Sequence, residues 1–91
     1  MSMSLAAYAA RWVRERHVER QSDALYSDRP VELTVIHNRW AAQAGRPPLT
    51  VEQAPAKVIR AVETTRDGRR LFARSRESAG RIVYPLRGEE E

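Results

Sequence analysis

The N-terminal part of the chain has apolar residues at the spacing of an α-helix. Apolar side chains recur three or four positions apart, at Leu5, Tyr8, Ala9, Trp12 and Val13. This spacing places them on one helix face, and Ser4 directly before them is a favourable N-cap. We predict a helix over residues 5–22. Leu25 and Tyr26 then either extend this helix or pack back on the core.

A second helical pattern follows a turn-forming segment at residues 27–30. Its apolar face is formed by Leu33, Ile36, Trp40 and Ala44. Gly45 is a typical helix stop, and Pro47 and Pro48 prevent the helix from continuing. The pattern therefore predicts a second helix over residues 33–44.

A third helix is predicted from the segment that begins at Thr50. Thr50 and Gln53 have the spacing of a capping box, and apolar residues recur at Val51, Ala54, Val58, Ile59 and Val62. Pro55 would remove a backbone hydrogen bond if it lay past the first helical turn. Either the helix is kinked there, or a short turn over residues 50–54 precedes a helix that begins at Pro55. We expect Asp67 and Gly68 to end it.

The C-terminal part has the pattern of a β-hairpin. Residues 70–74 and 81–86 are predicted strands, and residues 76–80 are turn-like. Ile82, Tyr84 and Leu86 would share one face, and Pro85 suits a strand end or an edge strand. Because an isolated hairpin is barely stable, it must dock on the helices. The expected fold class is mainly α with a β-hairpin, in one domain over residues 1–88, followed by a disordered acidic tail at 89–91.

Three helices followed by a two-stranded wing resemble the winged helix-turn-helix family. The stretch from Val31 to Leu86 is similar to the small winged-helix modules of phage and plasmid replication proteins, notably the domain at the end of primase-helicases. The residues that carry the resemblance are Val31-Glu32-Leu33, Ile36, Trp40, Gly45, Pro48-Leu49-Thr50, Gly68-Arg69-Arg70 and Val83-Tyr84. The resemblance implies double-stranded DNA as the partner, with the third helix in a major groove. Pro55 and the long link from Gly45 to Leu49 depart from the family pattern.

The charge of the chain is positive and is unevenly distributed. The net charge is +4, the isoelectric point is about 10.3, and Lys57 is the only lysine among sixteen basic residues. Residues 57–87 carry nine basic and three acidic side chains. We expect codon usage in a GC-rich genome, such as that of a phage of a high-GC bacterium, to explain the larger part of the arginine content. The excess in the C-terminal third indicates a polyanion partner.

Two groups of residues are the candidates for DNA contact. On the third helix, the side opposite the apolar face carries Gln53, Lys57, Arg60 and Thr64, and such side chains read bases in the major groove. The hairpin would carry Arg69, Arg70, Arg74, Arg76 and Arg81 toward phosphates. The alternatives are an ordinary solvated helix face and a charged edge strand that resists aggregation.

Several classes of function have no support in the sequence. The chain has no cysteine, no apolar run of membrane-spanning length and no signal-peptide pattern, so we expect a cytoplasmic protein. His17 and His37 lack metal-ligand spacing and are predicted to lie at the surface or at the boundary of the core. No nucleophile elbow or phosphate-binding glycine loop occurs. We therefore expect no catalytic site, metal or cofactor.

Partners other than DNA give specific structural expectations. A homodimer through the first helix would be supported if Leu5, Tyr8 and Trp12 formed an exposed patch. Without such a patch, we expect Trp12 to pack in the core, as we expect of Trp40. A protein-interaction module, such as a phage protein that binds a host protein, is the alternative function. It gains support if Glu63, Asp67 and Glu77 neutralise the basic residues. An RNA-binding role would require exposed Tyr84 or Phe72.

Overall fold

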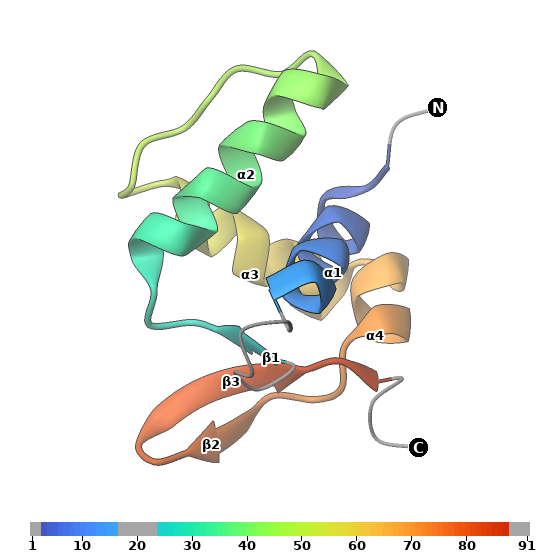
Figure 1. The fold of residues 1–91 in the computed structure, drawn as a ribbon, viewed down its shortest axis with the longest axis vertical. Helices are drawn as coiled ribbons and strands as arrows, with labels where there is room; N and C mark the ends of the chain where they lie inside the picture. Colours follow the sequence, from blue (N-terminus) through green and yellow to red (C-terminus); the bar gives the residue numbers. More distant parts are fainter. Residues whose placement is uncertain (1–2, 17–23, 88–91) are drawn as a thin grey trace.

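The structure, a computed structural model, describes residues 3–16 and 24–87 of the chain. Within these ranges, four helices and a three-stranded sheet form two layers, with the helices above the sheet in the view of Figure 1. The elements in chain order are α1 (Leu5–Arg16), β1 (Ala24–Tyr26), α2 (Pro30–Ala44), α3 (Ala54–Thr64), α4 (Arg66–Leu71), β2 (Arg76–Ser78) and β3 (Arg81–Pro85).

Helix α1 begins where the sequence predicts, because Ser4 caps it. The Ala7 backbone N–H donates to Ser4 Oγ at 3.1 Å, and the Tyr8 N–H donates to the Ser4 carbonyl. The predicted helical residues 17–22 lie outside the described part of the chain, as does His17. Extension of the helix through Leu25 is wrong, because Leu25 lies in β1 and is fully buried in the core.

Helix α2 ends at the predicted residue but begins three residues earlier. Pro30 occupies the first turn, where its missing N–H leaves no hydrogen bond unmade and its fixed φ fits the helix. At the other end, Gly45 has a φ of 71°, the left-handed conformation that suits a helix terminus. Pro30 therefore begins a helix in a segment for which the sequence pattern predicts only a turn.

Asn38 of α2 holds the link between α2 and α3. Its side-chain amide donates to the Leu49 carbonyl at 3.0 Å, and its Oδ1 accepts from the Leu49 N–H at 2.9 Å. After this anchor, residues 51–53 form a turn and α3 begins at Ala54. Of the two alternatives for Pro55, the short turn before the helix is confirmed to within one residue, because Pro55 lies in the first turn.

The end of α3 corrects the prediction of three helices. Helix α3 stops at Thr64, and a fourth helix, α4, follows after one extended residue, Thr65. Thr65 Oγ1 accepts the Gly68 N–H at 3.0 Å and donates to the Ala61 carbonyl, so this residue ends one helix and caps the next. Gly68 thus lies inside α4 and is not a helix stop.

Gly68 is required because α4 packs directly against the backbone at the end of α3. A Cβ atom at this position would lie 2.2 Å from the Val62 carbonyl oxygen and 2.4 Å from that of Ala61. No side-chain rotation relieves a contact with backbone atoms. The absence of a side chain at Gly68 therefore permits the observed packing of the two helices.

The sheet differs from the predicted two-stranded hairpin. Residues 70 and 71 belong to α4, and only Phe72 of the predicted first strand pairs with the sheet, through a bridge to Leu86. The strand β2 lies at residues 76–78, which we had expected to be a turn, and β1 was not predicted. The sheet order is β1-β3-β2, with both pairs antiparallel. Pro85 ends β3, as its missing N–H favours.

Burial confirms most of the predicted core and corrects three positions. Buried apolar side chains of α1, α2, α3, β1 and β3 meet those of the segments after α4 and β3, and Leu71 of α4 packs against them as a partly buried side chain. The buried set includes Leu5, Val13, Leu25, Leu33, Ile36, Val58, Val62, Phe72, Tyr84 and Leu86. Val51 and Ile82 are exposed instead, because the turn at 51–53 and the hairpin tip extend beyond the helices. His37 is 2% exposed, so the prediction that it lies at the surface or at the boundary of the core is wrong.

The surface of α1 does not present the patch that would support a homodimer. Leu5 is buried, and Tyr8 and Trp12 pack against the core as partly buried side chains. The Trp12 indole N–H also donates to Glu32 at 2.9 Å. Leu5, Tyr8 and Trp12 are therefore engaged within one copy of the chain.

We predict that Gly68→Ala destabilises the protein by about 3 kcal/mol, because the added methyl group overlaps backbone atoms that cannot rotate away. The matched control is Gly45→Ala, where no atom lies within 4 Å of the added carbon. Gly45→Ala should lower the free energy of unfolding by only about 1 kcal/mol, because alanine must then adopt the left-handed backbone conformation. Urea unfolding of both variants gives the comparison; equal losses would contradict the close contact at Gly68.

We predict that Asn38→Ala lowers the free energy of unfolding by about 2 kcal/mol, since two hydrogen bonds to Leu49 are lost. Asn38→Asp keeps the acceptor for the Leu49 N–H but places a carboxylate oxygen opposite the Leu49 carbonyl, so it too should lower the free energy of unfolding. Amide hydrogen exchange at Leu49 should accelerate in Asn38→Ala and change less in Asn38→Asp. Unchanged exchange at Leu49 in both variants would contradict the anchor.

Candidate nucleic-acid interface

Lys57, Arg60 and Thr64 lie on the outward face of α3, whereas Gln53, predicted on the same helix, lies in the turn directly before it. Gln53, Lys57, Arg60 and Thr64 are all exposed, while Ala54, Val58 and Val62 on the opposite side are buried. We call these four exposed residues the α3 face. The helical spacing therefore located the exposed side of this helix correctly.

Only the two cations of the α3 face are unengaged within the described part of the chain. Gln53 Oε1 lies 3.4 Å from Thr50 Oγ1, and Thr64 Oγ1 donates to the Arg60 carbonyl at 2.8 Å. Neither the Lys57 ammonium nor the Arg60 guanidinium forms an ion pair or hydrogen bond with a described residue. Lys57 and Arg60 are thus the members of the face with their charge fully available to a ligand.

The five arginines assigned to the hairpin occupy three different settings. Arg69 and Arg70 lie on α4, Arg74 lies in the link after it, and Arg76 and Arg81 lie on β2 and β3. Arg70 pairs with Asp67 at 3.1 Å. Arg74 and Arg76 are exposed, and neither pairs with an acidic residue in the described ranges.

Arg81 is engaged with the turn between β1 and α2. Its guanidinium contacts both carboxylate oxygens of Asp28, the nearer at 2.8 Å, and lies 4.7 Å from the centre of the Tyr26 ring. Arg29 lies 4.3 Å from the same ring centre. The hydrogen bond from Arg81 lowers the pKa of the Asp28 carboxyl below its ordinary value. Arg81 therefore holds the hairpin to β1 and is the weakest of the predicted phosphate contacts.

A cleft of about 380 Å³ lies where the end of α3, the link after α4 and β3 meet. We call it the arginine cleft, because three guanidinium groups contribute to its lining. It is lined by Val62, Glu63, Arg69, Phe72, Ala73, Arg74, Ser75, Tyr84 and Arg87. Sequence reasoning selected Arg69 and Arg74 but missed Arg87, Glu63 and Tyr84, since they are distant in the chain and no local pattern joins them.

A hydrogen bond between Tyr84 and Glu63 closes one side of the arginine cleft. The Tyr84 hydroxyl donates to Glu63 Oε2. Burial raises the pKa of Tyr84 well above its ordinary value, and the Glu63 carboxylate raises it further. The hydroxyl therefore stays protonated. Because Tyr84 and Phe72 are 5% and 2% exposed, they offer no stacking surface of the kind an RNA-binding role requires.

Two backbone carbonyls fix two of the guanidinium groups in the arginine cleft. Arg87 Nε donates to the Arg69 carbonyl at 2.7 Å, and Arg69 Nε donates to the Glu63 carbonyl at 3.4 Å. These bonds use the inner nitrogen of each group and leave the terminal nitrogens without a partner among the described residues. The cleft can therefore offer several charge-assisted donors to an anion.

Comparison with known proteins adds no relative of this chain. No family model matches it, and searches of curated proteins and of solved structures find no match. In the described ranges, no helix has the length and apolar composition of a membrane span, and no three acidic or histidine side chains gather as metal ligands do.

We predict that Arg81→Ala raises the pKa of Asp28 toward the ordinary aspartate value, as followed by NMR titration of the side-chain carboxyl. Because the pKa is depressed in the folded protein, the stabilisation is present above the unfolded pKa and is lost as the pH falls through the folded one. Asp67 is the internal control, since bonds from Ser4 and Arg70 lower its pKa instead. A matching rise at Asp67 would indicate general unfolding and contradict the specific pair.

Proposed function

We propose that this protein binds double-stranded DNA through the α3 face and the arginines that follow it, and that it is a winged-helix domain. The observation that carries the proposal is the pair of exposed cations on α3, Lys57 and Arg60, which have no ion-pair partner among the described residues. Cations that neutralise phosphates release condensed counterions, which is the main source of sequence-independent affinity for DNA. Lys57 and Arg60 can also donate to guanine in a major groove.

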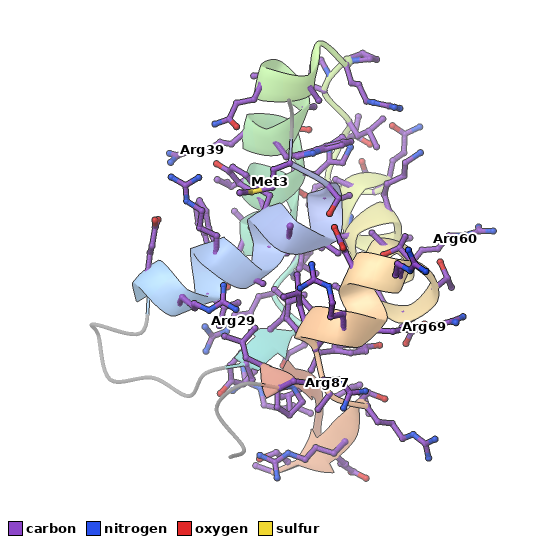
Figure 2. All side chains as sticks on the ribbon, turned by 90° about the vertical axis from the view of Figure 1, so that its right-hand side faces the viewer. Met3, Arg29, Arg39, Arg60, Arg69 and Arg87 are labelled. Carbon is purple, nitrogen blue, oxygen red and sulfur yellow. The ribbon has the colours of Figure 1, made fainter. Side chains whose placement is uncertain are left out.

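The distribution of engaged and unengaged arginines supports this location. Toward the N-terminus, Arg11 pairs with Glu15, and Arg39 lies over the Trp12 ring. Arg60 and Arg69 extend to one side of the molecule, and Arg29 and Arg39 lie on the other (Figure 2). Arg60 and Arg69 therefore present charge without an acidic partner among the described residues on the side formed by α3 and α4, although Arg14 and Arg39 elsewhere also lack an ion pair within those residues.

The order of the elements supports the winged-helix interpretation in part. Helices α2 and α3 precede a C-terminal hairpin, and β1 adds a third strand beside β3. The link between α2 and α3 covers residues 45–53, whereas a helix-turn-helix commonly uses three or four residues. In this proposal α3 enters the major groove, and Arg74 and Arg76 reach the phosphates beside it.

A protein-interaction module remains the second candidate function. It is favoured by the ion pairs of Arg70 with Asp67 and of Arg81 with Asp28, which remove two of the expected phosphate contacts. The exposed apolar residues Val31, Val51 and Ile82 also offer surface for a protein partner. Failure to bind DNA at low salt would favour this function.

We predict salt-dependent binding to a fluorescent duplex of random sequence, followed by anisotropy between about 50 and 200 mM salt. Lys57→Ala with Arg60→Ala should weaken binding and reduce the slope of log K against log salt by about 2, because two phosphate contacts are lost. Arg14→Ala with Arg39→Ala removes the same charge from α1 and α2 and should change the slope less. Equal effects of the two double variants, or no binding by the unmodified chain, would contradict the proposal.

A further inference from the structure

We infer that the arginine cleft binds a nucleoside monophosphate, with its phosphate on the arginine side and its sugar or base toward Glu63. This goes beyond the proposed duplex binding, because neither Lys57 nor Arg60 lines the cleft. The ligand is either a free nucleotide or the phosphorylated end of a DNA strand, since both present the same chemical group.

The arginine side of the cleft is arranged in advance for an anion. Arg87 is held by its Nε hydrogen bond of 2.7 Å to the Arg69 carbonyl, so it loses less side-chain freedom when a ligand binds, and Arg69 makes a longer Nε contact of 3.4 Å to the Glu63 carbonyl. Arg74 adds a third guanidinium with no partner among the described residues. Guanidinium groups match the geometry of phosphate oxygens through paired hydrogen bonds.

Glu63 adds a carboxylate to the lining beside the guanidinium groups, since Arg69 Nε donates to its backbone carbonyl. It is the only acidic residue of the lining, and one of its oxygens already accepts from the protonated Tyr84 hydroxyl. A carboxylate repels phosphate but accepts hydrogen bonds from sugar hydroxyls and base amino groups. A ligand that carries both an anionic group and such donors can therefore bind the arginines and Glu63 together.

The size of the cleft favours a nucleotide over a bare phosphate ion. Small-molecule sites commonly have volumes of about 300–1,000 Å³, and the cleft has about 380 Å³. The buried side chains of Phe72 and Val62 give it an apolar wall. A phosphate ion alone would leave this wall and Glu63 without contacts, whereas a sugar and base would cover them.

The test is a titration of the full chain with each of the four deoxynucleoside 5′-monophosphates, followed by NMR at the Arg69 and Arg87 Nε–H groups. We expect Arg74→Ala and Arg87→Ala each to weaken binding about tenfold, as loss of a charge-assisted hydrogen bond does. Arg74→Ala breaks no hydrogen bond within the described chain, so it keeps the test valid if Arg87→Ala fails to fold. Arg76→Ala, an equal charge loss outside the lining, should leave nucleotide binding unchanged.

Glu63→Gln tests the direction of the ligand. Glutamine still accepts from Tyr84 but carries no charge, so inorganic phosphate should bind more tightly and the preference for nucleotide over phosphate should fall. Inorganic phosphate binding as tightly as nucleotides to the unmodified chain would overturn the inference. Equal weakening by Arg74→Ala and Arg76→Ala would also overturn it, since general electrostatics would then explain binding.

Two duplexes distinguish the sources of the ligand. If a duplex with 5′-phosphate ends binds more tightly than one with 5′-hydroxyl ends, and free nucleotide competes with it, a strand end occupies the cleft. If free nucleotides bind and the two duplexes bind with equal affinity, the ligand of the cleft is a free nucleotide. Lys57→Ala with Arg60→Ala should reduce duplex binding without changing nucleotide binding, so failure of the duplex proposal and failure of this inference are separable.

Discussion

The close approach of α4 to the backbone at the end of α3 determines where the C-terminal third of the chain lies. Only Gly68 permits this approach, because a Cβ atom would overlap the Val62 and Ala61 carbonyls. The hydroxyl of Ser4 strengthens the arrangement from outside, by donating to Asp67 at 2.6 Å and so joining the start of α1 to α4. With α4 held there, Phe72 enters the core and the chain returns as the β2–β3 hairpin.

Strand β3 connects the packed core to the residues that line the arginine cleft. It pairs with β1 on one side and β2 on the other, and its Tyr84 and the following Leu86 are buried. The same strand brings the Tyr84 hydroxyl to Glu63 of α3 and places Arg87 against the Arg69 carbonyl. The arginine cleft is therefore a product of the same contacts that hold the core together. The α3 face, in contrast, needs only a helix with a buried opposite side.

Electrostatics separates the basic residues into structural and available groups. Arg70 pairs with Asp67 of the same helix, and Arg81 pairs with Asp28 of the turn after β1, so both charges are already matched within the fold. Lys57, Arg60, Arg74 and Arg76 have no acidic partner in the described chain. The distinction matters because solvent-exposed pairs contribute little to stability, whereas unpaired guanidinium groups on one side attract a polyanion.

The sequence by itself determined the elements whose signals are local. Ser4, Gly45 and the period of apolar residues located the start of α1, the end of α2 and the exposed side of α3, since capping and amphipathicity act within a few residues. The predicted acidic tail at 89–91 lies outside the described residues. Only the tertiary structure decided that residues 66–71 form α4, that residues 24–26 join the sheet and that His37 is buried. Thr65 before Asp67 was a local cap signal for α4, but the close contact at Gly68 and the meeting of Glu63, Arg69, Tyr84 and Arg87 depend on packing between distant segments.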